Sequence, residues 1–214
     1  MFYEPNVDNA LRFGDVLTGY ILSNPDYKEP NFFRKDEDQK YRINIEIPKY
    51  SVVLTPCCSI KEGLISLTPL KEVLKTFFNN KYLAEDLTNI NRRMTALESM
   101  TAENWEKLKE EERQERLEEG MQYAFPRYFI YEENDFFTEY KRSKKMIRYY
   151  MIDLKNICSI KCPMIKSAEK LKLEDAPLLE SKILQLSVDI RQELREKVAD
   201  YFSTAPKEDI ARQD

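Results

Sequence analysis

The chain has 214 residues, of which 42% are hydrophobic and 34% charged, and its net charge is −4. This composition is typical of a globular domain with additions, and no run approaches the ~20 consecutive apolar residues of a membrane span. The sequence contains no histidine, which excludes Ser-His-Asp triads, Cys-His dyads and His-rich metal centres. The first residues, MFYEPNVDNALRF, lack the basic start and apolar core of a secretory signal, so we expect a cytoplasmic protein.

Strands are predicted along the first 70 residues. Segment 41–47, YRINIEI, alternates between apolar and polar residues, which predicts a half-buried strand. Its apolar face carries Tyr41, Ile43, Ile45 and Ile47. Segment 50–55, YSVVLT, has apolar residues on both faces, as a strand buried on both sides has. Together with LISLTP at 64–69 it predicts a hairpin that turns at KEG, with each strand ending at a proline.

A helix is predicted to follow this hairpin. Thr68 is suited to cap it, and Pro69 is suited to its first turn. The apolar face of this helix carries Leu70, Val73, Leu74, Phe77 and Phe78.

Residues 79–120 differ in character and are predicted to form a charged helical insertion. Between residues 85 and 119 there are eleven acidic and six basic residues. The segment 101–120 begins with a possible cap at Thr101 and ends at Gly120, and its apolar stripe is thin. One interpretation is a solvated helical hairpin held by charge pairs four residues apart. The other is an arm that binds a protein partner, anchored by Trp105 and Leu108.

A basic segment lies between two further strand signals, RYFIYEE and MIRYYMIDL. Residues 140–150 contain five basic residues, three tyrosines and no acid. Lysines at a hairpin turn often protect a sheet edge, which is one interpretation. Basic residues among flat rings also suit single-stranded nucleic acid. The candidate residues for that contact are Lys141, Arg142, Lys144, Lys145, Arg148 and Tyr149.

The C-terminal part predicts an amphipathic helix with Ser187 as its cap, followed by a polar tail at 203–214. The apolar face of this helix carries Ile190, Leu194, Val198 and Tyr201 or Phe202. We therefore expect an α+β fold, with residues 1–78 and 121–214 forming a single core. The core is predicted to be a curved antiparallel sheet or a small SH3-like β-barrel of six or seven strands.

The four cysteines are open to three interpretations. Cys57 and Cys58 are adjacent, whereas Cys158 and Cys162 are four residues apart. Neighbouring residues of an extended chain point to opposite faces, so we expect buried thiols that pack as small hydrophobic groups, and no cofactor. A structural zinc site made by all four is the alternative, and a reactive Cys58 is the third interpretation.

Residues 11–78 resemble the MazF/PemK family of SH3-like toxin endoribonucleases in the order of Gly14-Asp15-Val16, VVLTP and LISLTPL. They also resemble uncharacterised prokaryotic proteins with an LS/TQxCDI-type segment, although Ser59 follows Cys58 where the aspartate should stand. In the toxin family an arginine in an Arg-Pro pair serves RNA cleavage together with a later threonine. Here Pro48-Lys49 or Tyr50-Ser51 stands in place of Arg-Pro, and Thr68 matches the threonine.

Two functions follow from these observations. The first is an intracellular interaction module of a prokaryotic or phage-related assembly, with a defence or toxin system as one setting. It would bind a protein through the acidic insertion or nucleic acid through residues 140–150. The alternative is a histidine-free MazF-like endoribonuclease with the catalytic candidates Asp15, Thr55, Cys58, Thr68 and Arg148. We favour the first, because it requires no replacement for the missing arginine.

Overall fold

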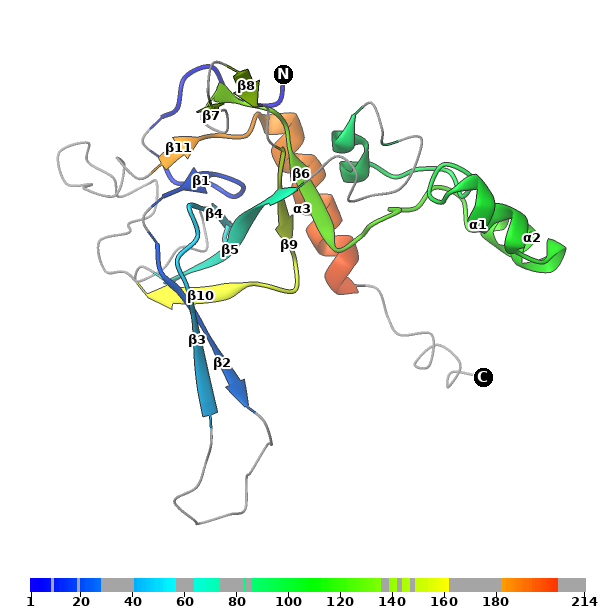
Figure 1. Ribbon diagram of the computed structural model, residues 1–214, viewed down its shortest axis with the longest axis horizontal. Coiled ribbons are helices and arrows are strands. Elements are labelled where there is room, and N and C mark those ends of the chain that lie inside the picture. Colours follow the sequence, from blue (N-terminus) through cyan, green and yellow to red (C-terminus); the bar gives the residue numbers. More distant parts are fainter. Residues whose placement is uncertain are drawn as a thin grey trace, which may run out of the picture. The chain divides into compact units, whose positions relative to one another are not determined.

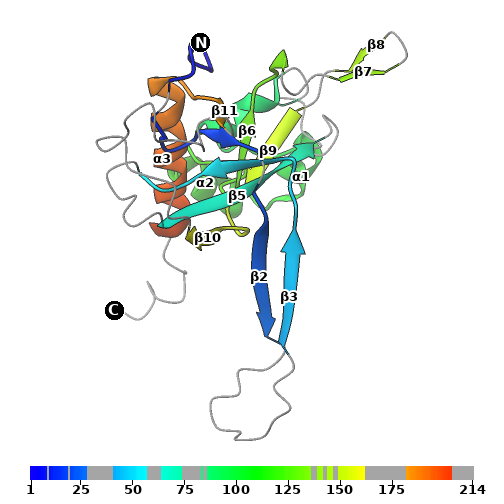
Figure 2. The same ribbon diagram turned by 90° about the vertical axis from the view of Figure 1, so that its left-hand side faces the viewer.

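The computed structural model describes residues 1–8, 10–18, 20–27, 41–56, 64–73, 83, 86–135, 139–141, 144–146, 149–161 and 182–203. The fold is α+β, with antiparallel strands and three α-helices in this part of the chain, which confirms the predicted class (Figures 1 and 2). Two compact units make it up: a sheet unit of residues 6–70 and 156–185, and a helical unit of residues 1–5, 71–155 and 186–214. None of the described helices has the length and hydrophobicity needed to cross a membrane.

The sheet unit is built from antiparallel strands in the order β11-β1-β4-β5-β10. A separate hairpin pairs β2 with β3. The described strands form an open path, so closure into an SH3-like barrel stays a prediction. The strands of this unit are β1 (Val16–Leu17), β2 (Leu22–Tyr27), β3 (Tyr41–Glu46), β4 (Tyr50–Val53), β5 (Leu64–Val73), β10 (Cys158–Lys161) and β11 (Lys182–Leu184).

Strand β4 is the centre of this unit. All four of its residues are buried, which confirms the strand predicted from apolar residues on both faces. The pairing of β4 with β5 is also as predicted, with Val52 opposite Thr68. The core around these strands consists of Leu17, Leu22, Val53, Ile65, Leu67 and Cys158.

The predicted helix after Thr68 is wrong as far as Val73, because β5 continues to that residue. Pro69 lies opposite Ser51 in the ladder, and Thr68 is fully buried rather than a helix cap. Pairing with β4 and the burial of four consecutive residues, 67–70, outweigh the local preference for a helical first turn. Proline removes only one donor from the ladder. The other members of the predicted helical face, Leu74, Phe77 and Phe78, lie outside the described residues.

Strand β3 forms where it was predicted, but its apolar face is not half-buried. Ile43, Ile45 and Ile47 are 58%, 68% and 75% exposed. Alternation reveals that one face is apolar without revealing which face meets the core. In this hairpin the opposite face enters the core through Leu22, which pairs with Glu46 and is only 1% exposed. The side chain of Tyr41 lies outside the described part of the chain.

The helical unit contains the other described strands and the helices that the structure describes. Strand β6 pairs with β9, β7 pairs with β8, and β9 neighbours β5, whose last three residues belong to this unit. The strands predicted within 127–133 and 146–154 are confirmed as β6 and β9. The elements are the 3₁₀ helix η4 (Leu87–Asn91), α1 (Ala102–Lys107), α2 (Glu110–Glu118), β6 (Tyr128–Tyr131), β7 (Glu139–Lys141), β8 (Lys144–Met146), β9 (Tyr149–Asp153) and α3 (Val188–Ser203).

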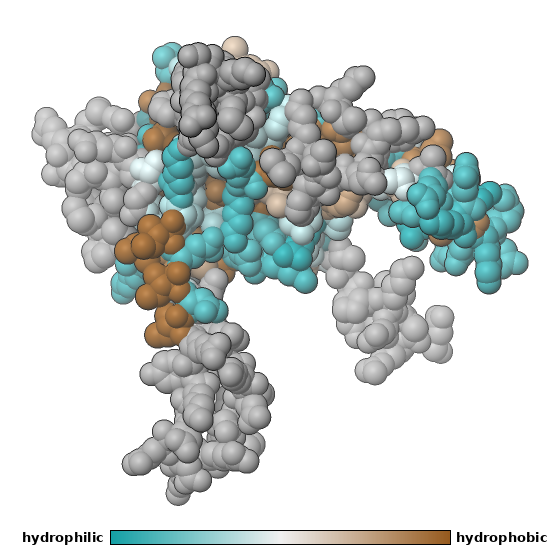
Figure 3. All heavy atoms as spheres, in the orientation of Figure 1, coloured by the Kyte–Doolittle hydropathy of each residue, from teal (hydrophilic) through white to brown (hydrophobic). Residues whose placement is uncertain are grey.

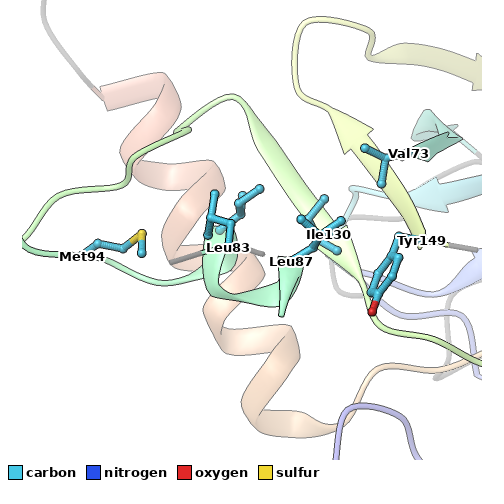
Figure 4. Close-up of a cluster of buried hydrophobic side chains, with 7 residues drawn as sticks. Val73, Leu83, Leu87, Met94, Ile130 and Tyr149 are labelled. Carbon is cyan, nitrogen blue, oxygen red and sulfur yellow. The ribbon is translucent and has the colours of Figure 1, made fainter. Parts of the chain in front are cut away.

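The core of the helical unit joins η4 to β6 and β9, and Figure 4 shows these side chains gathered together. Its members are Val73, Leu83, Leu87, Ile90, Met94, Ile130 and Tyr149. Asn91 closes the edge of β6, because its side-chain amide donates to the carbonyl of Ile130 and accepts from the N–H of the same residue, both at 2.7 Å. Residues 87–94, which the sequence predicts to be part of the insertion, therefore contribute to this core.

Helix α3 begins after Ser187, whose hydroxyl accepts from the N–H of Ile190 at 3.5 Å. Ile190 and Leu194 are buried, as predicted. Lys197 is the next buried position, whereas Val198 is half-buried; both positions follow the helical face of residues 190 and 194. Phe202 is largely exposed.

The helical arm, defined here as residues 95–121, leaves and returns at a backbone bridge between Met94 and Gln122. Thr101 caps α1 by accepting from the N–H of Asn104 at 3.3 Å, as predicted. Gly120 ends the helices with a φ of 74°, a backbone angle that residues other than glycine rarely adopt. No residue of α2 is buried.

Candidate functional site

Asp15, the acidic catalytic candidate, lies in a buried polar cluster of the sheet unit. The loop that holds it is pinned to β4, because Gly14 donates to the carbonyl of Val53 at 2.7 Å and Val53 donates to the carbonyl of Asp15 at 3.0 Å. Its side chain is fully buried and lies 2.7 Å from the ammonium of Lys182 on β11. The N–H of Arg12 donates to the same carboxylate oxygen at 2.7 Å.

Lys182 is surrounded by acceptors. Its ammonium donates to the carbonyl of Ala10 at 2.5 Å and to the side-chain oxygen of Gln185 at 2.9 Å, and it lies 3.4 Å from Asp8. The Lys182 side chain is only 1% exposed. Such a saturated ammonium holds the N-terminal segment, β1 and β11 together, and it leaves neither charge accessible to a polymeric substrate.

Asp8 lies at the rim of this cluster, about half exposed. Burial acts to raise its pKa, but the hydrogen bond from Arg12, the N–H of Ala10 and the charge of Lys182 outweigh it and lower the pKa of Asp8 to about 2. The sequence gives no signal for this cluster, because Lys182 lies more than 160 residues from both Asp8 and Asp15, and each of the three is a residue type typical of a surface position.

The two threonine candidates have structural partners. Thr68 is fully buried in β5. The hydroxyl of Thr55 accepts from the N–H of Ser66 at 2.7 Å, and the N–H of Leu54 donates to the carbonyl of Ser66 at 2.8 Å. These bonds continue the β4–β5 pairing past the end of β4. The structure therefore places Thr68 within β5 and Thr55 just beyond the end of β4, where both serve the sheet.

Of the cysteines, the structure describes Cys158. This side chain packs in the core of the sheet unit, paired through β10 with Leu67, and behaves there as a small hydrophobic group. Within the described residues no three Cys, Asp or Glu side chains are arranged to hold a metal ion. Because Cys57, Cys58 and Cys162 lie outside that part of the chain, the zinc site and the reactive Cys58 stay predictions.

The basic segment forms a hairpin of β7 and β8, with Tyr140 opposite Lys145 and Lys141 opposite Lys144. The side chains of Lys141, Lys144 and Lys145 lie outside the description, as do Arg142 and Arg148 altogether. Tyr149 is 7% exposed and packs in the core of the helical unit, and burial together with a hydrogen bond to Glu133 raises its pKa.

The helical arm is held together by its own bonds. Arg113 on α2 donates to the carbonyl of Trp105 at 3.1 Å and to the carbonyl of Glu106 at 2.7 Å. The partner-binding candidates Trp105 and Leu108 are half-buried. All eight acidic side chains of α1, α2 and the turn after them are exposed, beside the exposed Leu117 and Met121, and Figure 3 shows a hydrophilic surface here.

A second buried lysine, Lys197, lies in the helical unit, next to Val198, which the sequence predicts on the apolar face of the C-terminal helix. The ammonium of Lys197 donates to the carbonyl of Ile90 and lies 5.0 Å from the centre of the Tyr123 ring. Burial lowers the pKa of Lys197 to about 7, against the attraction of Asp200. Full burial keeps this amine from external substrates, although a pKa near neutrality is common for reactive lysines.

Comparisons of the chain with protein-family models, curated proteins and solved structures give no match.

Proposed function

We propose that this chain is an interaction module, part of an intracellular prokaryotic or phage-related assembly, and that it binds a basic protein through its helical arm. The observation that carries this proposal is the arm itself: an ordered pair of helices that buries no residue of α2 and presents eight carboxylates. Helices of six and nine residues are too short to be stable alone. Capping at Thr101 and the contacts of Arg113 hold them in place, so the arm is preorganised for binding.

The charge and shape of the arm indicate the chemistry of the partner. Eight acidic and four basic residues between 101 and 120 repel nucleic acid and attract a surface rich in lysine and arginine. The half-buried Trp105 and the exposed Leu117 add apolar contact area among these charges. Aromatic anchors of this kind contribute much of the affinity at protein interfaces.

The alternative, a MazF-like endoribonuclease, has less support. Asp15 is fully buried and paired with Lys182, and Thr68 is fully buried in β5. A group that stabilises charge on a scissile phosphate must reach it within hydrogen-bond distance. Cleavage of a single-stranded RNA probe by the purified chain, lost in Arg148→Ala, would favour the endoribonuclease over the binding module.

The decisive experiment compares proteins captured from a cell extract by three immobilised forms of the chain. The arm variant carries Glu106→Gln, Glu111→Gln and Glu115→Gln, which removes three exposed charges without loss of helix propensity. The matched control carries three equally conservative changes at exposed acids outside the arm. These are Glu72→Gln, Asp189→Asn and Glu196→Gln.

We expect a basic protein that is enriched by the wild type and the control, is lost from the arm variant, and dissociates as the salt concentration rises. Replacing residues 98–120 by a short Gly-Ser linker between the bridged residues Met94 and Gln122 should abolish the same capture. A partner retained equally by all forms would contradict binding through the arm.

A further inference from the structure

The β2–β3 hairpin carries an exposed apolar face. Alternation along β3 places Ile43 and Ile45 on the same side, and Ile47, directly after the strand, continues the alternation. Ile45 lies opposite Ser23, so Ser23 and therefore Ile21 share that side. Ile21 is 61% exposed and the other three isoleucines are 58% to 75% exposed. We call these four residues the isoleucine face; Figure 3 shows hydrophobic residues gathered along the described part of this hairpin.

The exposure of this apolar face is unusual for a two-stranded ribbon in water. The hairpin is anchored by Leu22 on its other side, and it pairs only with itself in the described sheets. Two-stranded ribbons are marginally stable in water unless a face is covered. Isoleucine is well suited to a strand buried on that face, and contiguous apolar patches of several hundred Å² usually mark an interface.

The size of the isoleucine face fits a pair of identical copies. Four isoleucines exposed by more than half offer on the order of 400 Å² of apolar surface. Two such faces packed together approach ~1,000 Å², the lower limit for a specific interface. Packed β-sheets interdigitate their side chains at a separation of about 10 Å, which two facing ribbons can reach without rearrangement.

The charges on the hairpin favour the same occupant. The isoleucine face has no charged residue among its described positions, whereas Glu46 alternates to the other face. A chain with a net charge of −4 would repel its own copy at most surfaces, and this face avoids that repulsion. In the described part of the chain, the remaining exposed large hydrophobic residues are those of the helical arm and others scattered singly over the rest of the chain. These include Val7, Leu64, Leu97, Leu117, Val188 and Phe202.

We propose that the chain forms a homodimer with two-fold symmetry, in which the isoleucine faces of two β2–β3 hairpins pack against each other. The contact is isologous, so each isoleucine of one copy meets the same surface on the other. Ile45, in the middle of the three exposed isoleucines at 43, 45 and 47, lies nearest the symmetry axis. The isoleucine face shares no residue with the helical arm, so dimerisation and capture of a basic partner can fail independently.

The test is the molar mass in solution, measured by light scattering after size exclusion and by sedimentation equilibrium up to about 100 µM. The wild type is expected to have twice the chain mass. Ile45→Glu places a charge in the apolar contact and should weaken dimerisation more than about tenfold. Asn44→Glu is the matched control, because its exposed side chain lies on the opposite face, and it should remain dimeric.

Hydrogen exchange of the wild type gives a second readout that does not depend on how the variants fold. Amides of residues 43–47 should gain protection as the protein concentration rises through the dimerisation range. A monomeric wild type, a dimer that Ile45→Glu leaves intact, or a dimer whose hairpin gains no protection would each overturn the proposal. Binding of the monomer to phospholipid vesicles or to a different protein through this face would do the same.

Discussion

Replacing the buried Lys197 by methionine should stabilise the protein near neutral pH and lose that advantage in alkali. Methionine retains the length and volume of the side chain but removes the amine. In the folded protein burial lowers the pKa of Lys197 to about 7, against 10.5 for a lysine in water. Asp200 attracts the ammonium, and the Tyr123 ring faces it at 5.0 Å, yet burial dominates.

The sign of the effect follows from proton binding. Between pH 7 and pH 10.5 the unfolded chain binds a proton at this position that the folded chain releases, so the stability of the wild type rises with pH. Below pH 7 the cost of burying the charged amine is fully present, and it is on the order of 5 kcal/mol. The variant avoids this cost but leaves the carbonyl of Ile90 without its donor, which costs about 1–3 kcal/mol.

Lys197→Met should therefore be more stable than the wild type by roughly 3 kcal/mol at pH 6, and less stable at pH 10. The assay is urea unfolding at several pH values, followed by circular dichroism and tryptophan fluorescence. Arg195→Met, an exposed position on the same helix, controls for loss of a positive charge and should change stability little at any pH. A constant difference between Lys197→Met and wild type from pH 6 to pH 10 would refute the reasoning.

Three further predictions concern the buried bonds and the basic hairpin. Lys182→Met leaves the charge of Asp15 buried without its partner and should lower the free energy of unfolding by about 3–5 kcal/mol. Adding Asp15→Asn should restore part of this loss. A change below ~1 kcal/mol in urea unfolding would speak against a buried ion pair. Asn91→Ala should cost about 2–4 kcal/mol, because two backbone groups at the edge of β6 lose their partners, and thermal unfolding tests this. Lys144→Glu with Lys145→Glu should weaken binding of a single-stranded RNA probe in fluorescence anisotropy, and undiminished binding would remove the nucleic-acid hypothesis.

Local sequence patterns predicted the structure correctly where it depends on a single local preference. The helices of the arm begin after Thr101 and end at Gly120, as predicted, because capping and a positive φ depend only on adjacent residues. The burial of β4 follows from its run of apolar residues. The prediction of a helix after Thr68 was wrong because the local helix preference is weaker than the pairing of β5 with Tyr50 and Ser51 of β4.

The candidate site was less predictable than the elements. The sequence makes Asp15 a catalytic candidate, yet its role depends on Lys182, which lies more than 160 residues away and has no distinctive sequence context. Lys197 occupies a core position that its residue type argues against. Such pairs come together only when distant segments pack, so neither could be inferred from spacing.

The sequence by itself determined the α+β class, the alternation of β3, the charge of the arm and the chemistry that the absence of histidine excludes, since these depend on residue type and short-range geometry. The tertiary structure alone decided which face of β3 turns outward and which charges are buried. Both depend on which surface a segment meets, and that is set by the rest of the core: Leu22 turns one side of the hairpin inward and leaves Ile43, Ile45 and Ile47 in the solvent.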